Sequence, residues 1–157
     1  MAVSKDDIKT NYPLPVYNYR VEIGSDAVGF SEVSGLSISY ETSTYKESPV
    51  ESGAPGPRVM IMPAQKAAPT ISLKKGVVPA SSIATLFNWI NATQINQVEK
   101  KDIYVRLLDE AGAPVISWHV VNAFPTKLDA PTFDTKSNDA AIESMELMAD
   151  AVFVEVA

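Results

Sequence analysis

Apolar residues at every second position constrain this chain more than any other feature of its sequence. Between residues 16 and 23, apolar side chains alternate with Asn18, Arg20 and Glu22. The same period of two returns in residues 70–76. Successive side chains of a strand point to opposite sides of a sheet, so this period is typical of strands with one buried face. The sequence therefore predicts a mainly β fold.

Further strands are expected from runs of β-forming residues bounded by turn residues. They are residues 28–42 (with a bend at Gly35), 103–108, 114–121 and about 142–154. Periodicity alone also allows a helix over 138–149, but residues 152–156 continue the stretch as a strand. The expected architecture is an antiparallel β-sandwich or barrel of six to seven strands with one short flanking α-helix.

The helix is expected to begin near Pro79, with a capping serine in Ser81-Ser82. Its apolar stripe, spaced at i, i+3, i+4 and i+7, consists of Ile83, Leu86, Phe87 and Ile90. A helix of about two to three turns is marginal by itself in water, so we expect it to dock on the sheet.

The 157 residues fit a single domain, 1–157, with two segments outside the strand pattern. Residues 1–15 form a polar N-terminal arm that ends in Tyr12-Pro13-Leu14-Pro15. Residues 41–69 hold five of the eleven prolines and are expected to form a long Pro/Gly-rich loop, with at most a short strand at 59–62. Loops of this length inside a domain are usually disordered or functional.

Composition excludes several classes of function. The net charge is 13 − 19 = −6, which disfavours direct nucleic-acid binding, because phosphate contacts need clustered Lys and Arg. Cysteine is absent, so disulfides, thiolate nucleophiles and Cys-based metal sites are excluded. No signal peptide and no membrane span are recognised, so we expect the chain to be made in a cytoplasm.

No residue combination indicates catalysis, so we expect no enzyme and no catalytic, cofactor-binding or metal residue. The single histidine, His119, lies in mid-strand, where a packed or surface role is the usual one. Residues 53–58 contain glycines but lack the Gly-Lys-Ser/Thr ending of a phosphate loop. A hydrolase that uses only Asp and Glu stays an alternative, and it would show a pocket with a raised carboxyl pKa.

Three features are compatible either with an ordinary structural role within one chain or with a role at a subunit contact. Trp89 is either peripheral core or an aromatic anchor. Glu99, Lys100 and Lys101 form either an exposed turn or a charged rim that meets a neighbouring copy. Tyr12 is either an anchored arm residue or frayed.

Short segments along the chain occur in an order that resembles a known family. They are residues 12–15, 30–36, 73–77, 86–91, 97–103, 118–125 and 146–150. Together they resemble the inner tube proteins of contractile injection systems, within the phage tail tube superfamily. The likeness is greatest to the tubes of antifeeding-prophage and Photorhabdus virulence cassette particles, and it runs from about residue 12 to 156.

The resemblance implies a structural protein without cofactors, whose copies form six-membered rings that stack into a hollow tube. The implied partners are other copies, a sheath protein, baseplate and tube-terminating proteins, and a cargo in the lumen. The particle would be phage-like, and it would drive the tube through a target envelope when the sheath contracts. Type VI secretion ring proteins are related to the same family.

On this interpretation the 41–69 loop reaches a neighbouring subunit. Its candidate contact residues are Tyr45, Lys46, Glu47 and Arg58. Two alternatives are a β-sandwich module that binds carbohydrate or peptide without polymerising, and a ring protein of the same family that does not polymerise.

Overall fold

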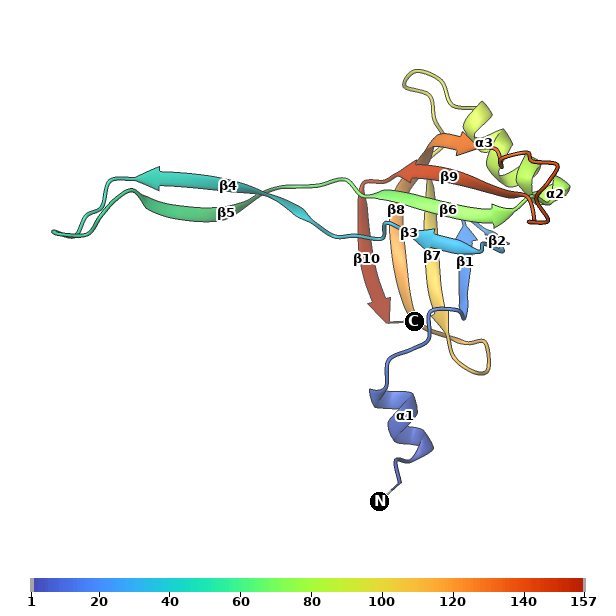
Figure 1. The fold of residues 1–157 in the computed structure, drawn as a ribbon, viewed down its shortest axis with the longest axis horizontal. Coiled ribbons are helices and arrows are strands. Elements are labelled where there is room, and N and C mark those ends of the chain that lie inside the picture. The colour runs from blue at the N-terminus through green and yellow to red at the C-terminus, as the bar shows by residue number, and fades with distance from the viewer. Residues whose placement is uncertain (1, 157) are drawn as a thin grey trace.

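Two antiparallel sheets share one long strand in the computed structural model, which describes residues 2–156 (Figure 1). The first sheet runs in the order β2 (Asp26–Val28), β1 (Tyr19–Ile23), β7 (Lys101–Leu108), β8 (Pro114–Asp129) and β10 (Ala151–Val156). The second runs β3 (Glu32–Ser34), β6 (Thr70–Gly76), β9 (Ile142–Met148) and the end of β8. The mainly β, antiparallel fold predicted from the sequence is confirmed.

Strand β8 belongs to both sheets and turns the corner between them. Its first half pairs with β7 and β10, and its second half pairs with β9. Asn122 lies between the halves with a φ of 53°. Its amide side chain donates a hydrogen bond to Asp150, 2.8 Å away. Asparagine tolerates this left-handed conformation better than most residues, which lets the strand bend here.

The core lies between the two sheets. Its fully buried side chains include Ile23, Ile103, Val120 and Val152 from the first sheet and Ile71, Leu73, Met145 and Leu147 from the second. These are the inward positions of alternating strands, as the period of two predicted.

Strand boundaries differ from the expected ones in four places. The stretch 142–154 is not one strand, because the chain bends at Asp150 between β9 and β10, which pair with different halves of β8. Strand β1 begins at Tyr19, and Val16 and Tyr17 before it are exposed. Strand β8 runs to Asp129, although the sequence favoured a connection from residue 126. The stretch 28–42 is not one strand, because β3 ends at Ser34 and the chain bends away at Gly35. The sandwich and its hairpin together hold ten strands in the described residues.

Replacing Gly35 with alanine is expected to destabilise the fold by roughly 1–3 kcal/mol or more. Gly35 has a φ of 86°, and an added Cβ would lie 2.1 Å from the carbonyl oxygen of Thr70. Urea unfolding measures the loss. The control is Gly112→Ala, where φ is 79° but no atom lies within 4 Å of the added Cβ. Equal losses in the two variants would show that the contact with Thr70 does not matter.

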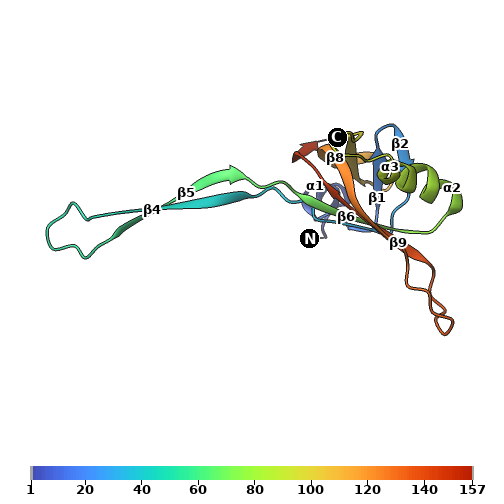
Figure 2. The ribbon, with the colours of Figure 1, turned by 90° about the horizontal axis from the view of Figure 1, so that it is seen from above.

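The predicted helix covers one end of the sandwich as α2 (Pro79–Ser81), a π-helical turn η1 (Ser82–Phe87) and α3 (Asn88–Asn91) (Figure 2). Its buried residues are Ser82, Leu86 and Trp89, whereas Ile83 and Phe87 are exposed. The predicted stripe was therefore wrong in part, because the wider π turn shifts which positions face inward. Nor does a serine cap the helix. Ser82 Oγ accepts a hydrogen bond from the N–H of Val78, 3.0 Å away.

The segment 41–69 is mostly not an irregular loop. It forms a hairpin of β4 (Tyr40–Glu47) and β5 (Arg58–Lys66) that projects from the sandwich (Figures 1 and 2). The prediction of a long loop was wrong because most of its prolines lie in the tip at 48–57. The flanking Thr, Tyr, Val and Ile residues favour paired strands. We call residues 40–66 the arm.

The N-terminal residues contain a short helix, α1 (Lys5–Asn11), that stands away from the sandwich (Figure 1). Ser4 caps it, since its Oγ accepts the N–H of Asp7 at 3.1 Å. No residue of α1 is buried.

Candidate functional site

The arm presents two exposed faces and contributes nothing to the core. Residues opposite each other in its ladder share a face. One face, the tyrosine face, carries Ser43, Tyr45, Glu47, Arg58, Met60 and Met62. The other, the isoleucine face, carries Thr42, Thr44, Lys46, Val59, Ile61 and Pro63. No arm residue is buried, and Ile61 is 71% exposed. A two-stranded hairpin is marginal alone in water, so this one is suited to being covered by a partner.

The structure brings the four candidate residues of this segment together on the outer half of the arm. Tyr45 lies opposite Met60, and Lys46 lies opposite Val59. Glu47 and Arg58 lie opposite each other at the tip end, and their charged groups are 3.8 Å apart. An ion pair this exposed contributes little to stability. Both groups are therefore available for contacts outside the chain.

Tyr12 follows α1 and is half exposed. It lies beside a cavity of about 770 Å³ between the N-terminal residues 5–18 and the sandwich. One ion pair, Lys9 to Glu110 at 2.9 Å, joins α1 to the turn after β7. That contact raises the pKa of Lys9 and lowers the pKa of Glu110. An exposed pair of this kind stabilises little, so α1 is weakly attached.

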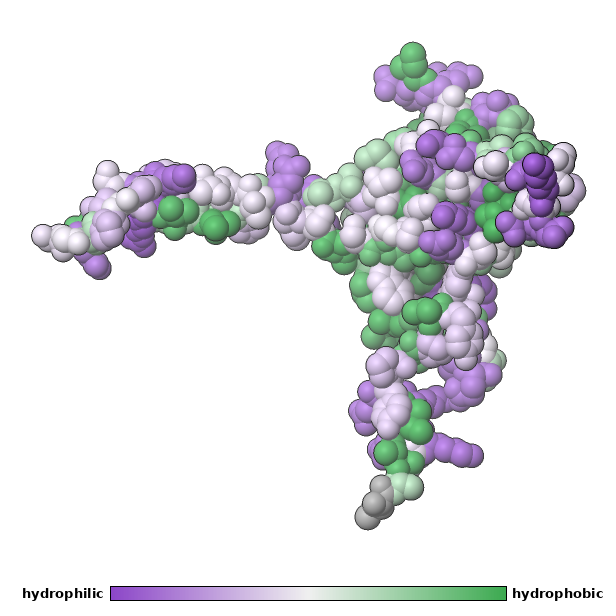
Figure 3. Space-filling model, viewed as in Figure 1, coloured by the Kyte–Doolittle hydropathy of each residue, from purple (hydrophilic) through white to green (hydrophobic). Residues whose placement is uncertain are grey.

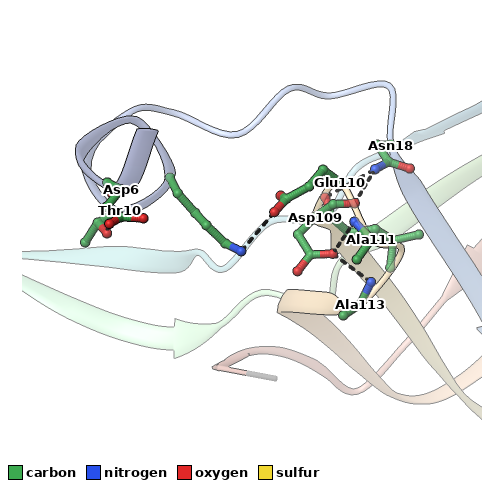
Figure 4. A network of polar contacts seen from close by, with 9 residues as sticks. Asp6, Thr10, Asn18, Asp109, Glu110, Ala111 and Ala113 are labelled. Carbon is green, nitrogen blue, oxygen red and sulfur yellow. Dashed lines mark hydrogen bonds and ion pairs between the residues drawn. The ribbon is translucent and has the colours of Figure 1, made fainter. Parts of the chain in front are cut away.

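The turn that carries Glu110 is held by hydrogen bonds of its own (Figure 4). Asp109 Oδ1 accepts hydrogen bonds from the N–H groups of Ala111 and Ala113, both at 2.9 Å. These bonds lower the pKa of Asp109, the one from Ala113 most. The turn is therefore held by its own hydrogen bonds, whereas α1 is joined to it by one exposed ion pair.

Trp89 is a core residue, which corrects its candidacy as an anchor at a subunit contact. Its side chain is 4% exposed, and its indole N–H donates to the carbonyl oxygen of Glu99 at 2.7 Å. The ammonium group of Lys101 lies over the indole ring, 5.1 Å from the centroid. A buried indole ring needs a hydrogen-bond acceptor for its N–H, and α3, which follows the π turn, places Trp89 where Glu99 supplies one.

The charged triplet beside Trp89 engages its own chain. Lys100 Nζ lies 4.0 Å from Asp150 and 5.5 Å from the ring of Phe124. The Glu99 side chain is exposed. Glu99, Lys100 and Lys101 thus form a mixed-charge rim at one end of the sandwich.

His119 is packed on the outer face of the first sheet, as its position in a strand indicated. Its ring stacks on Tyr104 with the centroids 4.3 Å apart. Its two ring nitrogens lie 3.1 Å from Asp102 Oδ2 and from Glu155 Oε1. The nearby Ser117 is fully buried and accepts a hydrogen bond from Arg106, so it cannot reach a substrate.

Acid is expected to weaken the fold through Asp102. The N–H of Asn122 and then His119 hold the pKa of this carboxyl below its usual value. A lowered folded-state pKa adds stability that is complete above the unfolded value, about 3.9, and is lost as pH falls through the folded value. Asp102→Asn should therefore flatten the stability profile below about pH 4.

Urea unfolding at a series of pH values tests this expectation. Glu155→Gln is the matched variant, because it changes the other carboxylate beside His119 and leaves the Asn122 contact intact. An Asp102→Asn profile with the wild-type acid slope would contradict the assignment.

A buried ion pair under the helix escaped the sequence analysis. Lys75 and Glu143 lie opposite each other on β6 and β9, 3.6 Å apart, with side chains 2% and 11% exposed. Lys75 Nζ also donates to the carbonyl oxygen of Gly76 at 2.8 Å and to Ser82 Oγ at 3.2 Å. The sequence did contain a signal for this pair. Lys75 follows Ile71 and Leu73 at the same spacing of two residues, so its side chain lies on the same buried face of β6.

An apolar groove opens where the first sheet extends beyond the second. It has a volume of about 540 Å³ and lies between β3 and the lower part of β1, β7 and β8. Its lining includes Tyr19, Glu32, Leu36, Leu107 and Trp118. No group of three His, Cys, Asp or Glu side chains that could hold a metal occurs in residues 2–156. Within the same residues no helix is long and apolar enough to cross a membrane.

A family model described as the T4-like virus tail tube protein gp19 matches residues 15–152. A comparison with curated proteins gave no match.

Two solved structures resemble the whole chain. A chain of the extracellular contractile injection system PVC sheath–tube complex in the extended state is 42% identical, with a TM-score of 0.89, and the match covers 99% of this chain and 100% of that one. A chain of the anti-feeding prophage tube terminating cap is 43% identical, with a TM-score of 0.83 and complete coverage of both chains. Hcp1 from Flavobacterium johnsoniae shares the fold at 15% identity, with a TM-score of 0.53 over 90% of this chain and 97% of that one.

Proposed function

The chain belongs to the T4-like virus tail tube protein gp19 family, and from that membership we propose that its copies form hexameric rings that stack into the hollow inner tube of a contractile injection particle. It is a structural tube subunit, related over its whole length to proteins of extracellular contractile injection systems. The observation that carries this function is the family match over residues 15–152.

The surface of the chain supports assembly with other copies. The arm exposes apolar side chains on both faces, and strands β2, β3 and β10 each lie at an open edge of a sheet. Open edges must be paired, covered or charged, and pairing with identical neighbours is one solution. A head-to-tail contact that closes makes a ring, and one that does not close makes a filament.

We further propose that the whole chain, 1–157, acts as one tube domain without catalytic activity. Its partners are other copies, a sheath protein, a baseplate and a tube-terminating protein, with a cargo in the lumen. Relatives from a sheath–tube complex and a terminating cap support these partners. Tyr12, Tyr45, Lys46, Glu47, Arg58, Glu99, Lys100 and Lys101 are the proposed interface residues.

Negative-stain electron microscopy with size-exclusion chromatography tests the proposal on the purified, untagged protein at several concentrations. Rings or hollow tubes of uniform diameter are the expected result. A monomer at every concentration, even with a baseplate fraction added as a nucleus, would contradict polymerisation. It would favour the non-polymerising binding module or ring protein.

A further inference from the structure

We infer that the arm of one copy docks in the apolar groove of a second copy, where β4 pairs with the open edge of β3 and the isoleucine face covers the lower half of the first sheet. This inference rests on the proposed function, since it assigns the surface that receives the arm. It identifies the occupant as a second copy of this chain.

The inner face of the first sheet is covered only in part. The row formed by Ile23, Ile103, Val120 and Val152 is at most 2% exposed. The row of Tyr19, Leu107, Ile116 and Val156, four residues further along the same strands, is covered only in part. Val154 and Val156 are 50% and 91% exposed. The second sheet therefore ends too early, and the rest of this apolar face needs another layer.

Strand β3 lies at the edge where that layer is missing. It pairs with β6 on one side and with no strand of residues 2–156 on the other. The groove lies between this edge strand and the first sheet, and β3 supplies Glu32, Val33 and Ser34 to its lining. An added strand beside β3 would extend the second sheet across the uncovered rows, which is the geometry of β-augmentation.

The arm has the shape and chemistry for this position. It is a two-stranded ribbon whose isoleucine face exposes Val59 and Ile61, so it can bury apolar surface against the first sheet. The only charged residue on this face is Lys46, and the groove is lined by one charged residue, Glu32. The tyrosine face carries both Glu47 and Arg58, which pair with each other, so it offers no unpaired positive charge to Glu32.

Backbone donors favour β4 over β5 as the strand that pairs with β3. Pro63 in β5 has no N–H, and proline in a ladder usually turns its nitrogen away from the partner strand. The outer edge of β5 therefore lacks one donor. Strand β4 contains no proline and can offer a continuous edge.

The same molecule cannot fill its own groove with this arm. The arm leaves the sandwich beside β10 and extends away from the body in both ribbon views (Figures 1 and 2). Green, apolar residues stay visible below β3 in the space-filling view (Figure 3). A contact of arm to groove between copies is head-to-tail, so it can be repeated without end, as a tube requires.

Cysteine mapping tests the inference directly, because the chain has no cysteine of its own. Ser34→Cys places a thiol at the β3 edge, and Thr44→Cys places one on the isoleucine face. The two variants are prepared separately, mixed before assembly and treated with a short bismaleimide cross-linker. A denaturing gel should then show a covalent dimer. Ser43→Cys, one residue away on the tyrosine face, replaces Thr44→Cys in the matched control and should give a severalfold weaker dimer band.

A second pair of variants measures assembly without cysteine chemistry. Ile61→Lys should abolish assembly, whereas Met62→Lys, also exposed but on the tyrosine face, should retain it. Tubes that form without the Ser34–Thr44 dimer, or with an equal Ser34–Ser43 dimer, would overturn the docking inference and leave the tube function standing. A wild-type protein that forms no ring or tube under any condition would overturn the proposed function, and the inference with it.

Discussion

Deleting residues 46–58 is expected to give a folded monomer that no longer polymerises. The deletion removes the outer half of the arm, which has no buried residue and no side chain in the core. The sandwich should therefore keep its stability, while the apolar strip that would bind a second copy is lost. Size-exclusion chromatography and electron microscopy measure assembly, and circular dichroism with thermal unfolding measures the fold.

A deletion of similar size elsewhere controls for a general effect of shortening. Residues 130–141 form an exposed connection between β8 and β9, on the side of the body away from the arm (Figure 2). Shortening this connection should leave assembly intact. Normal tubes from the 46–58 deletion would show that the arm is not an assembly element, whatever the control does.

Replacing Lys75 with alanine is expected to destabilise the fold by about 3–5 kcal/mol, the usual cost of leaving one partner of a buried ion pair alone. Lys75 is 2% exposed, and its loss leaves the buried carboxylate of Glu143 without a counter-ion. One oxygen of that carboxylate already has no hydrogen-bond donor. Urea unfolding under conditions where the protein is monomeric measures the loss.

The neighbouring lysine is the control. Lys74 pairs with Glu32 at 3.5 Å, but both side chains are about half exposed, so Lys74→Ala should cost less than about 1 kcal/mol. The double variant Lys75→Met with Glu143→Met should recover most of the stability, because two apolar side chains replace the pair without an orphaned charge. Equal effects of Lys75→Ala and Lys74→Ala would show that burial of the pair contributes nothing.

The strands of the sandwich were predictable because burial on one face leaves a period of two in the sequence. Residues 70–76 show this most directly, since the predicted strand coincides with β6. The helix was predictable as an element but not in its buried face. The π turn moved Ile83 and Phe87 to the surface and brought Ser82 and Trp89 inward, a shift that depends on what the helix packs against.

The candidate contact residues were predictable only where they lie on exposed segments. Tyr45, Lys46, Glu47 and Arg58 do lie together, but on a paired hairpin. Proline and glycine counts could not distinguish a hairpin with a proline-rich tip from an irregular loop. The local sequence around Trp89 is compatible with either a core residue or an anchor at a subunit contact. Only the residues that pack around it in the fold distinguish the two roles.

By itself, the sequence determined the β class, the single core and the family, because alternation and the order of short motifs are local properties of the chain. The tertiary structure alone decided the corner at Asn122, the buried pair of Lys75 and Glu143, and the early end of the second sheet over the first. Each of these depends on residues far apart in the chain. Whether a side chain is buried, paired or uncovered is set by the partner across the sheet, and a linear pattern does not contain that partner.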